Sequence, residues 1–133
     1  MKKEIDSYRP LSNSLTLGLR EKLIVEWTYN SNAIEGNTLT MSETKVVLEG
    51  ITIGGKSVIE HLETINHKDA IVFLEKLIQE NEDVSEWNIK NVHSLILKDI
   101  DNQNAGKYRN ENVIISGANH IPPNHVLLQE LMQ

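Results

Sequence analysis

Residues 57–79, SVIEHLETINHKDAIVFLEKLIQ, decide the fold class of this chain. Apolar side chains recur along them at helical spacing, which is typical of an amphipathic helix with one face on a core. The stripe consists of Ile65, Phe73 and Leu77, with Leu62 and Leu74 beside it. The stretch therefore predicts one long helix.

The residues before this helix predict a second long one. Over residues 15–34, apolar side chains recur on one face at steps of four and seven residues, which favours a helix. They are Leu19, Leu23, Trp27 and Ile34. Gly36 follows at once and suits the position just after a helix end. Residues 1–14 form a polar lead-in.

Capping signals predict two further helices. Thr40 and Glu43 make a T-x-x-E capping box, which predicts a short helix through Leu48. Asp83 begins a similar D-x-x-E box, which predicts a helix over residues 85–100.

The last part of the chain predicts a hairpin. Residues 112–115 are prone to form a strand, and a polar turn with one glycine follows them. The hairpin should be exposed, because Pro122 and Pro123 have no N–H to donate to a ladder. The helical pattern returns at Val126. The predicted fold class is therefore all-α, a bundle of four or five helices over residues 15–133 with one short β-hairpin.

Composition excludes several classes of protein. A length of 133 residues suits one domain. The absence of Cys excludes a disulfide scaffold, a zinc ribbon, an iron–sulfur protein and a thiol nucleophile, and fits a cytoplasmic location. A net charge of −6 argues against nucleic acid or an anionic membrane as partner. The His residues lack the spacing of a metal site, so we expect no metal.

The segment Ser31-Asn-Ala-Ile-Glu35-Gly36 has two interpretations. On a helix, Ser31 and Glu35 are four residues apart and share a face. Glu35 would lie at the C-terminal end, where the helix dipole disfavours an anion. It is either a solvated surface residue beside a capping glycine, or a carboxylate directed at a cation, most simply an Arg that binds it with two hydrogen bonds.

The stretch from Ala105 to Pro123 also allows more than one interpretation. Arg109 precedes the predicted hairpin and could either bind phosphate or tie the hairpin to the helices. The hairpin could offer its edge to an extended peptide. It could also do no more than cap the core.

Together these two segments resemble the Fic domain family, whose members transfer AMP from ATP to protein hydroxyls. Members that inhibit themselves carry the pattern [ST]-x-x-x-E-[GN] on a helix, which here runs from Ser31 to Gly36. The family's target-docking flap follows A-G-x-[YF]-R and precedes a Pro pair. Those elements are similar to Ala105-Gly-Lys-Tyr-Arg109 and to Pro122-Pro123.

The resemblance implies roles for both segments. Residues 15–37 would be the inhibitory helix, which acts through Ser31, Glu35 and Gly36. Residues 105–124 would hold the flap, which aligns a target segment by main-chain pairing. The implied docking residues are Val113, Ile114, Ile115 and Ser116, and Arg109 and His120 are implied to be structural or to lie on the phosphate side.

One family motif is missing from these residues, the catalytic loop H-P-F-x-x-G-N-G-R. In the family it follows the flap by one helix and supplies the catalytic His, amides for the phosphates and an Arg for the γ-phosphate, with which Glu35 would pair. We therefore expect no catalytic residue and no cofactor in this chain, which would be inactive alone. ATP with Mg²⁺ would bind a longer parent protein, truncated here within a helix. The partner would be a protein substrate, either another protein or the parent itself.

Three functions are compatible with this pattern. The first is the N-terminal regulatory and target-docking part of an auto-inhibited Fic protein adenylyltransferase. The second is a stand-alone, non-catalytic regulator of the antitoxin kind, which would inhibit a separate Fic enzyme through its inhibitory helix. The flap argues against the second, because a pure inhibitor has no use for one. The third is a small helical interaction module unrelated to nucleotides.

Overall fold

The computed structural model describes residues 4, 6, 7 and 9–133 of the chain. Its main elements are the helices α2 (Asn13–Ile34), α3 (Met41–Leu48), α4 (Val58–Gln79) and α5 (Glu86–Leu97). A 3₁₀ turn, η1 (His125–Leu127), leads into the short helix α6 (Leu128–Leu131). The described residues contain no strand, so the predicted helical class is confirmed.

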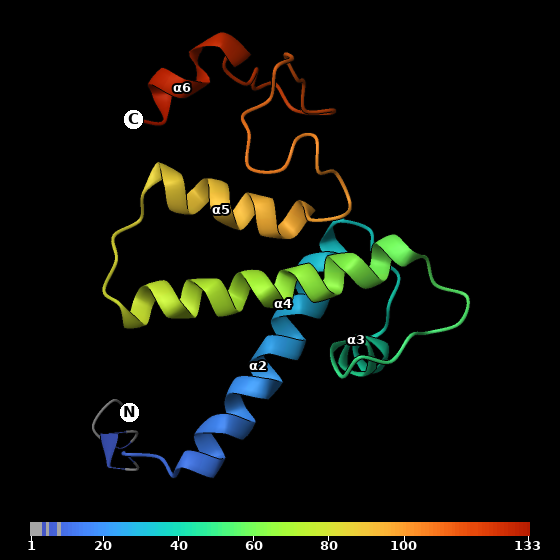
Figure 1. The fold of residues 1–133 in the computed structure, drawn as a ribbon, viewed down its shortest axis with the longest axis vertical. Helices are drawn as coiled ribbons and strands as arrows, with labels where there is room; N and C mark the ends of the chain where they lie inside the picture. The colour runs from blue at the N-terminus through green and yellow to red at the C-terminus, as the bar shows by residue number, and fades with distance from the viewer. Residues whose placement is uncertain (1–3, 5, 8) are drawn as a thin grey trace.

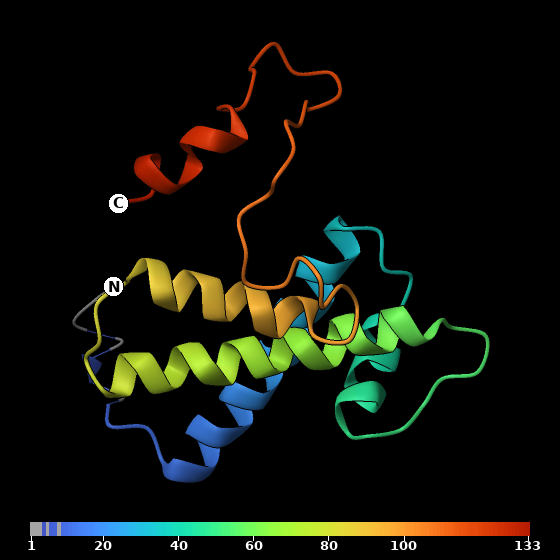
Figure 2. The same cartoon turned by 45° about the horizontal axis from the view of Figure 1, so that its top comes forward.

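Helix α4 is the central element. It packs against α2, α3 and α5, and α3 also contacts α2. In Figure 1, α5 runs antiparallel beside α4, and α2 crosses α4. The C-terminal part of the chain leaves this group of helices, as both views show (Figures 1 and 2). Among the described elements, α6 makes close backbone contact with η1 but with none of α2 to α5.

Side-chain caps determine where the first three of these helices begin. Thr40 caps α3 and Ser57 caps α4, each in a capping box with the Glu three residues later. The first box was predicted, and the second was not. Helix α2 begins two residues before the predicted start, because the Ser12 hydroxyl accepts a hydrogen bond from the third residue after it.

Helix α5 differs from its prediction at both ends. The predicted box at Asp83 does not form, because Ser85 is the cap and accepts the hydrogen bond from the Asn88 N–H. Asp83 instead accepts, through its carbonyl oxygen, a hydrogen bond from the Asn88 amide at 3.0 Å. The helix ends at Leu97, three residues early, and the backbone turns left-handed at Asp99 with φ of 60°.

The predicted β-hairpin is not formed. Residues 112–115 have no regular secondary structure, and the turn that follows has one hydrogen bond, from Ala118 N–H to Ile115 O at 3.1 Å. The two strands of a β-hairpin both need backbone N–H donors, and Pro122 and Pro123 have none. The predicted exposure of this region is confirmed, since residues 110–121 are all exposed.

The buried core is small and partly polar. Its apolar members are Ile24, Leu39, Val47, Ala70 and Ile71. Its polar members are Thr28, Thr44, Thr64, Asn66 and Asn88. Thr28 Oγ1 lies 3.0 Å from His67 Nδ1, and burial lowers the pKa of His67. A neutral His67 ring can therefore form a hydrogen bond with the Thr28 hydroxyl at the edge of the core.

The predicted apolar face of α2 lies outside this core. Leu19, Leu23, Trp27 and Ile34 expose between 42% and 83% of their surface. The helical period was predicted correctly, but the helix is rotated so that Ile24 and Thr28 are the buried positions. Successive residues of an α-helix lie about 100° apart around its axis. Leu23 and Trp27 each precede a buried residue by one position, so the predicted apolar face points away from the buried contact.

The amide of Asn66 joins α4 to the end of α5. The side chain is only 3% exposed, and its Nδ2 donates to Ile96 O at 3.1 Å and to Lys98 O at 2.7 Å. The last carbonyls of a helix have no partner within the helix. Asn66 satisfies two of these groups and thereby determines where the chain leaves α5.

We predict that Asn66→Ala lowers the free energy of unfolding by about 1–3 kcal/mol, because two carbonyl oxygens lose their donor at a buried site. Urea unfolding followed by tryptophan fluorescence measures this change. Asn30→Ala is the matched control, since Asn30 is exposed and donates only to Glu26 O within its own helix. Equal losses in the two variants would show that Asn66 does not join the helices.

Candidate functional site

The end of α2 explains why a glycine follows Glu35. Glu35 is the C-cap residue, and Gly36 has a φ of +95°. The Gly36 N–H donates to Ala33 O at 3.1 Å, and the Asn37 N–H donates to Asn32 O at 3.0 Å. This pair of hydrogen bonds is a Schellman motif, which favours glycine at the left-handed position.

The same motif ends two more helices. Gly50 follows Glu49 at the end of α3 with φ of +92°, and Asn81 follows Glu80 at the end of α4 with φ of +53°. A Glu at the C-cap and a left-handed residue after it are therefore a general device of this fold. Gly36 has a complete structural explanation, so any specific role must come from Glu35.

The Glu35 side chain is presented to solvent. The residue is exposed, and its carboxylate has no hydrogen bond or ion pair with any residue that the structure describes. Ser31 is partly buried one turn earlier and makes no hydrogen bond to Glu35 within the same range. The carboxylate is thus available to a cation from outside these residues.

Two residues that follow Gly36 hold this end of α2 on α4. Asn37 Nδ2 donates to Glu60 O at 3.1 Å and to Glu63 Oε2 at 2.8 Å. Thr38 donates to Glu60 Oε1 through its N–H at 2.9 Å and through its hydroxyl at 2.5 Å. We call Asn37, Thr38 and Glu60 the tether. Sequence reasoning missed it, although the Ser57–Glu60 capping box was a visible signal.

The carboxylate of the tether, that of Glu60, has a strongly lowered pKa. Hydrogen bonds from the Thr38 hydroxyl, the Ser57 N–H and the Thr38 N–H lower the pKa of Glu60 from its ordinary 4.5 to about 2. Lys56 supports the same corner by donating to Thr38 O at 2.7 Å. The charged form of Glu60 therefore holds the helix end in place.

The motif before the flap packs on α5. Gly106 has a φ of +69°, and a Cβ at this position would overlap the Ser94 hydroxyl. The Gly106 N–H donates to His93 Nδ1 at 3.0 Å. Two residues on, the ring of Tyr108 lies under the Lys90 ammonium at 4.3 Å. The glycine and the aromatic residue therefore hold the start of the flap on α5.

Arg109 closes the base of the flap. One guanidinium nitrogen donates to Glu111 O at 2.7 Å, and the other donates to Pro123 O. Beside it, Asn112 Oδ1 accepts a hydrogen bond from the His125 N–H at 3.0 Å. Of the two roles left open for Arg109, these contacts favour the structural one. His120 is exposed in the flap, with no hydrogen bond to another described residue.

The middle of the flap has an open backbone. Val113, Ile114 and Ile115 are 45%, 87% and 54% exposed. In the described part of the chain, no backbone hydrogen bond uses the N–H groups of residues 113–116. A segment whose backbone N–H groups are unused can pair with another strand.

Two candidate sites therefore emerge, and the structure shows no direct bond between them within its described range. One is the Glu35 carboxylate at the tethered end of α2, and the other is the open flap. In both views the end of α2 lies beside the loop that follows α5 (Figures 1 and 2). No helix among the described residues is long and apolar enough to cross a membrane.

The part of the chain that the structure describes is a helical domain with an exposed carboxylate at one helix end and an exposed flap. No family model matches the chain. It is 37% identical over 97 residues to the protein adenylyltransferase Fic of Nematostella vectensis, and 33% identical over 129 residues to the protein adenylyltransferase fic-1 of Caenorhabditis elegans. The matches cover 71% and 93% of this chain and 22% and 25% of those relatives.

The fold is similar to a solved structure of Fic-1 from C. elegans. The TM-score is 0.76 at 30% sequence identity, and the match covers 97% of this chain and 38% of that one. The chain thus spans about a quarter of the length of the curated relatives it matches. In sequence and in fold the chain is similar to Fic protein adenylyltransferases, and these likenesses support the Fic family.

We predict that the tether makes stability depend on pH. Because the folded state lowers the pKa of Glu60, its contribution is present above pH 4.5 and is lost as the pH falls from there towards 2. Glu60→Gln should therefore lower stability at pH 7 and flatten the loss of stability on acidification. Urea unfolding at several pH values measures both effects.

Glu49→Gln is the control for this experiment, because Glu49 is an exposed C-cap residue without a side-chain hydrogen bond to the described residues. An unchanged slope of stability against pH in Glu60→Gln would contradict the role of the charged carboxylate.

Proposed function

We propose that this chain is the regulatory and target-docking part of an auto-inhibited Fic protein adenylyltransferase. Such an enzyme transfers AMP from ATP to a Ser, Thr or Tyr hydroxyl of a protein. The similarity to Fic adenylyltransferases over most of this chain supports the enzyme class. The observation that carries the regulatory role is the exposed Glu35 carboxylate, presented at a helix end that the tether holds in place.

The proposed inhibition is electrostatic. A carboxylate and an Arg guanidinium form a paired, charge-assisted interaction with defined geometry. If Glu35 pairs with the Arg that would otherwise bind the γ-phosphate, ATP binds in a pose that misaligns its α-phosphate with the attacking hydroxyl. Transfer of a phosphoryl-type group depends mainly on this alignment. The tether supports the proposal because it restricts where the carboxylate can be.

The described residues do not by themselves fit Mg²⁺. Across them, no group of three His, Asp or Glu side chains converges in a way that could hold a metal ion. We therefore propose that ATP and Mg²⁺ bind a longer parent protein rather than these residues alone. The isolated chain should lack transferase activity, since the catalytic loop motif is not among its residues.

We also propose that the flap docks the target. The N–H groups of residues 113–116 have no backbone partner in the described range, and Arg109 holds both ends of the flap together. A target segment would add as a strand along Val113 to Ser116, and would belong to another protein or to the parent. A cytoplasmic location and a partner other than nucleic acid fit the absence of Cys and the charge of −6.

We predict that loss of the Glu35 carboxylate activates the enzyme. The test replaces the matched segment of C. elegans Fic-1 with these residues and measures AMP transfer from labelled ATP. Glu35→Gly should raise transfer by at least about tenfold, because restoring alignment of a reacting group is worth one or more powers of ten. The same change in the isolated chain should yield no transfer.

Glu49→Gly is the matched control, because Glu49 and Gly50 form the same type of helix end as Glu35 and Gly36. It should leave transfer unchanged. Equal transfer by the unaltered chimera and the Glu35→Gly chimera would remove the inhibitory role from Glu35.

A further inference from the structure

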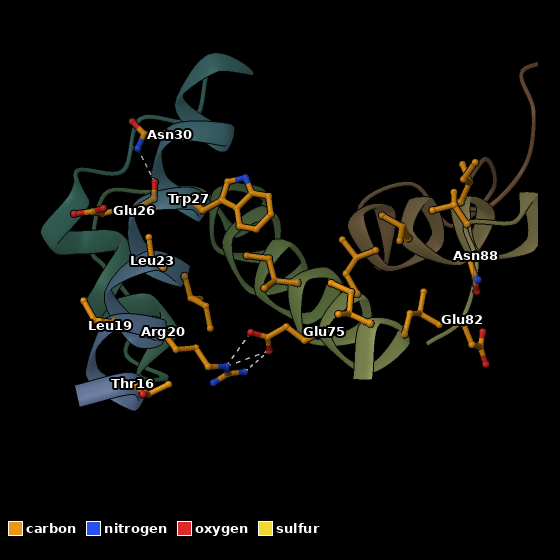
Figure 3. Close-up of a pocket in the computed structure, with 18 of the residues that line it drawn as sticks. Thr16, Leu19, Arg20, Leu23, Glu26, Trp27, Asn30, Glu75, Glu82 and Asn88 are labelled. Carbon is orange, nitrogen blue, oxygen red and sulfur yellow. Dashed lines mark hydrogen bonds and ion pairs between the residues drawn. The ribbon is translucent and has the colours of Figure 1, made fainter. Parts of the chain in front are cut away.

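The flap meets α5 at a cavity of its own. A large cavity lies elsewhere, between α2, α4 and α5, with Leu23 and Trp27 on α2 and the Arg20–Glu75 ion pair at its side (Figure 3). A second cavity, of about 610 Å³, is lined by residues of α5, of the chain that follows it and of α6. His93 of α5 lines this second cavity, which places a titratable ring where the flap begins.

One hydrogen bond determines the protonation state of His93. The Gly106 N–H donates to His93 Nδ1 at 3.0 Å. A ring nitrogen accepts a hydrogen bond only when it carries no proton, so the ring is neutral in this arrangement and its proton lies on Nε2. A protonated ring has an N–H at both nitrogens and therefore no acceptor. Turning the ring over cannot restore the bond, so protonation of His93 must break it.

The Gly106 backbone reaches His93 because it lies directly on α5. Its φ is +69°, and a Cβ at this position would overlap the Ser94 hydroxyl and come within 3.1 Å of Lys90 O. An N–H this close to a helix surface needs an acceptor, since leaving it without one costs free energy. When His93 is protonated, two N–H groups face each other instead. Water can replace the lost acceptor only if the backbone at Gly106 moves away from α5.

Gly106 is the first point at which the flap is held. Tyr108 follows, with its ring centre 4.3 Å from the Lys90 ammonium, and Arg109 then closes the base. Residues 113–116, whose N–H groups have no backbone partner in the described range, come shortly afterwards. A strand that adds to them must meet several N–H groups at once, and each hydrogen bond depends on direction. Movement at Gly106 therefore changes the direction in which the flap presents its backbone.

The charged groups around His93 come from α5 and from the chain after it. Those that line the same cavity are Lys90, which is paired with Glu86, and Lys107, Arg109 and Glu111. Among the described residues that line it, none of the charged ones belongs to α4 or α6. Asp101 is also near, because its pKa is lowered mainly by a hydrogen bond from Asn104 and in smaller part by the charge of His93. Asp101 favours a charged His93 ring and the basic groups oppose it, so these surroundings allow both protonation states.

We propose that His93 is a positioning residue for target docking, whose neutral ring holds the flap on α5 through Gly106 and whose protonation releases it. The proposal rests on the proposed function, because it takes the flap as the docking site. Histidine is the side chain that ordinarily changes its charge between about pH 5 and 8. Docking should therefore be strong at the upper end of this range and weaker at the lower end.

The first test follows the Gly106 amide of the ¹⁵N-labelled chain by NMR between about pH 8 and 5. Loss of the hydrogen bond should move its proton signal upfield, with the same midpoint as the His93 ring signals. In His93→Asn, the amide oxygen can accept in place of Nδ1 and does not titrate, so the signal should stay downfield throughout. In His93→Ala it should be upfield at every pH.

His120→Gln is the matched control for this measurement. His120 is exposed in the flap and has no hydrogen bond to another described residue. Its replacement removes a titrating ring from the flap itself and should leave the pH response of Gly106 unchanged.

The second test measures docking in the Glu35→Gly chimera with C. elegans Fic-1. AMP transfer from labelled ATP is followed with increasing amounts of C. elegans protein extract as acceptor. His93→Ala should raise the half-saturating concentration of acceptor by about threefold to tenfold, since one hydrogen bond is lost, and leave that of ATP unchanged. His93→Asn should restore the acceptor value and remove its rise towards about pH 6. A merely structural role would change the values for acceptor and ATP together.

Two results would overturn the proposal. One is a Gly106 signal that does not follow the His93 ring in the unaltered chain, or that follows pH equally in His93→Asn. The other is an unchanged half-saturating concentration of acceptor in His93→Ala, where Ile114→Pro/Ile115→Pro raises it by removing two N–H groups of the flap. If this double variant has no effect either, the proposed docking function itself fails, and the role of His93 in docking fails with it.

Discussion

The arrangement of this chain depends on one buried amide. Asn66 lies in the middle of α4, and its two hydrogen bonds to Ile96 O and Lys98 O fix the end of α5. From that end the chain turns at Asp99 and returns to α5, where Gly106 packs against Ser94. The base of the flap is therefore placed by a polar contact inside the core. The two hydrogen bonds of Asn66 Nδ2 avoid the cost of burying an unsatisfied donor there.

Helix α4 uses the same principle on its other neighbour. Earlier on α4 than Asn66, Glu60 and Glu63 accept hydrogen bonds from Thr38 and Asn37, which follow the end of α2. Apolar contacts are not directional, whereas hydrogen bonds restrict both distance and angle. Polar contacts along a single helix thus orient the two segments that carry the candidate sites, even though the apolar core is small.

Sequence reasoning predicted the helices well and their tertiary roles poorly. The helical spacing of apolar residues and the capping patterns predicted α2, α3 and α4, because both signals are local in the sequence. The same signals misplaced the cap of α5, where Asp83 and Ser85 compete and only the fold decides. The hairpin prediction was wrong because strand propensity depends on pairing, and the Pro pair removes donors from one arm. The tether joins residues over twenty positions apart, so no local pattern reveals it.

The Glu35 motif shows why residue type alone left two interpretations open. Three helices of this chain end with a Glu followed by a left-handed residue, so the pair Glu35-Gly36 has an ordinary structural origin. What distinguishes it from Glu49-Gly50 is the tether that follows. An inhibitory carboxylate must meet its cation within a fraction of an ångström to bind it with two hydrogen bonds. A frayed helix end would not achieve this, because the last turn of a helix is its least restrained part. The hydrogen bonds of Asn37 and Thr38 to α4 restrict that freedom, and this restraint, more than the Glu-Gly sequence, is the feature that the proposed inhibition by Glu35 requires.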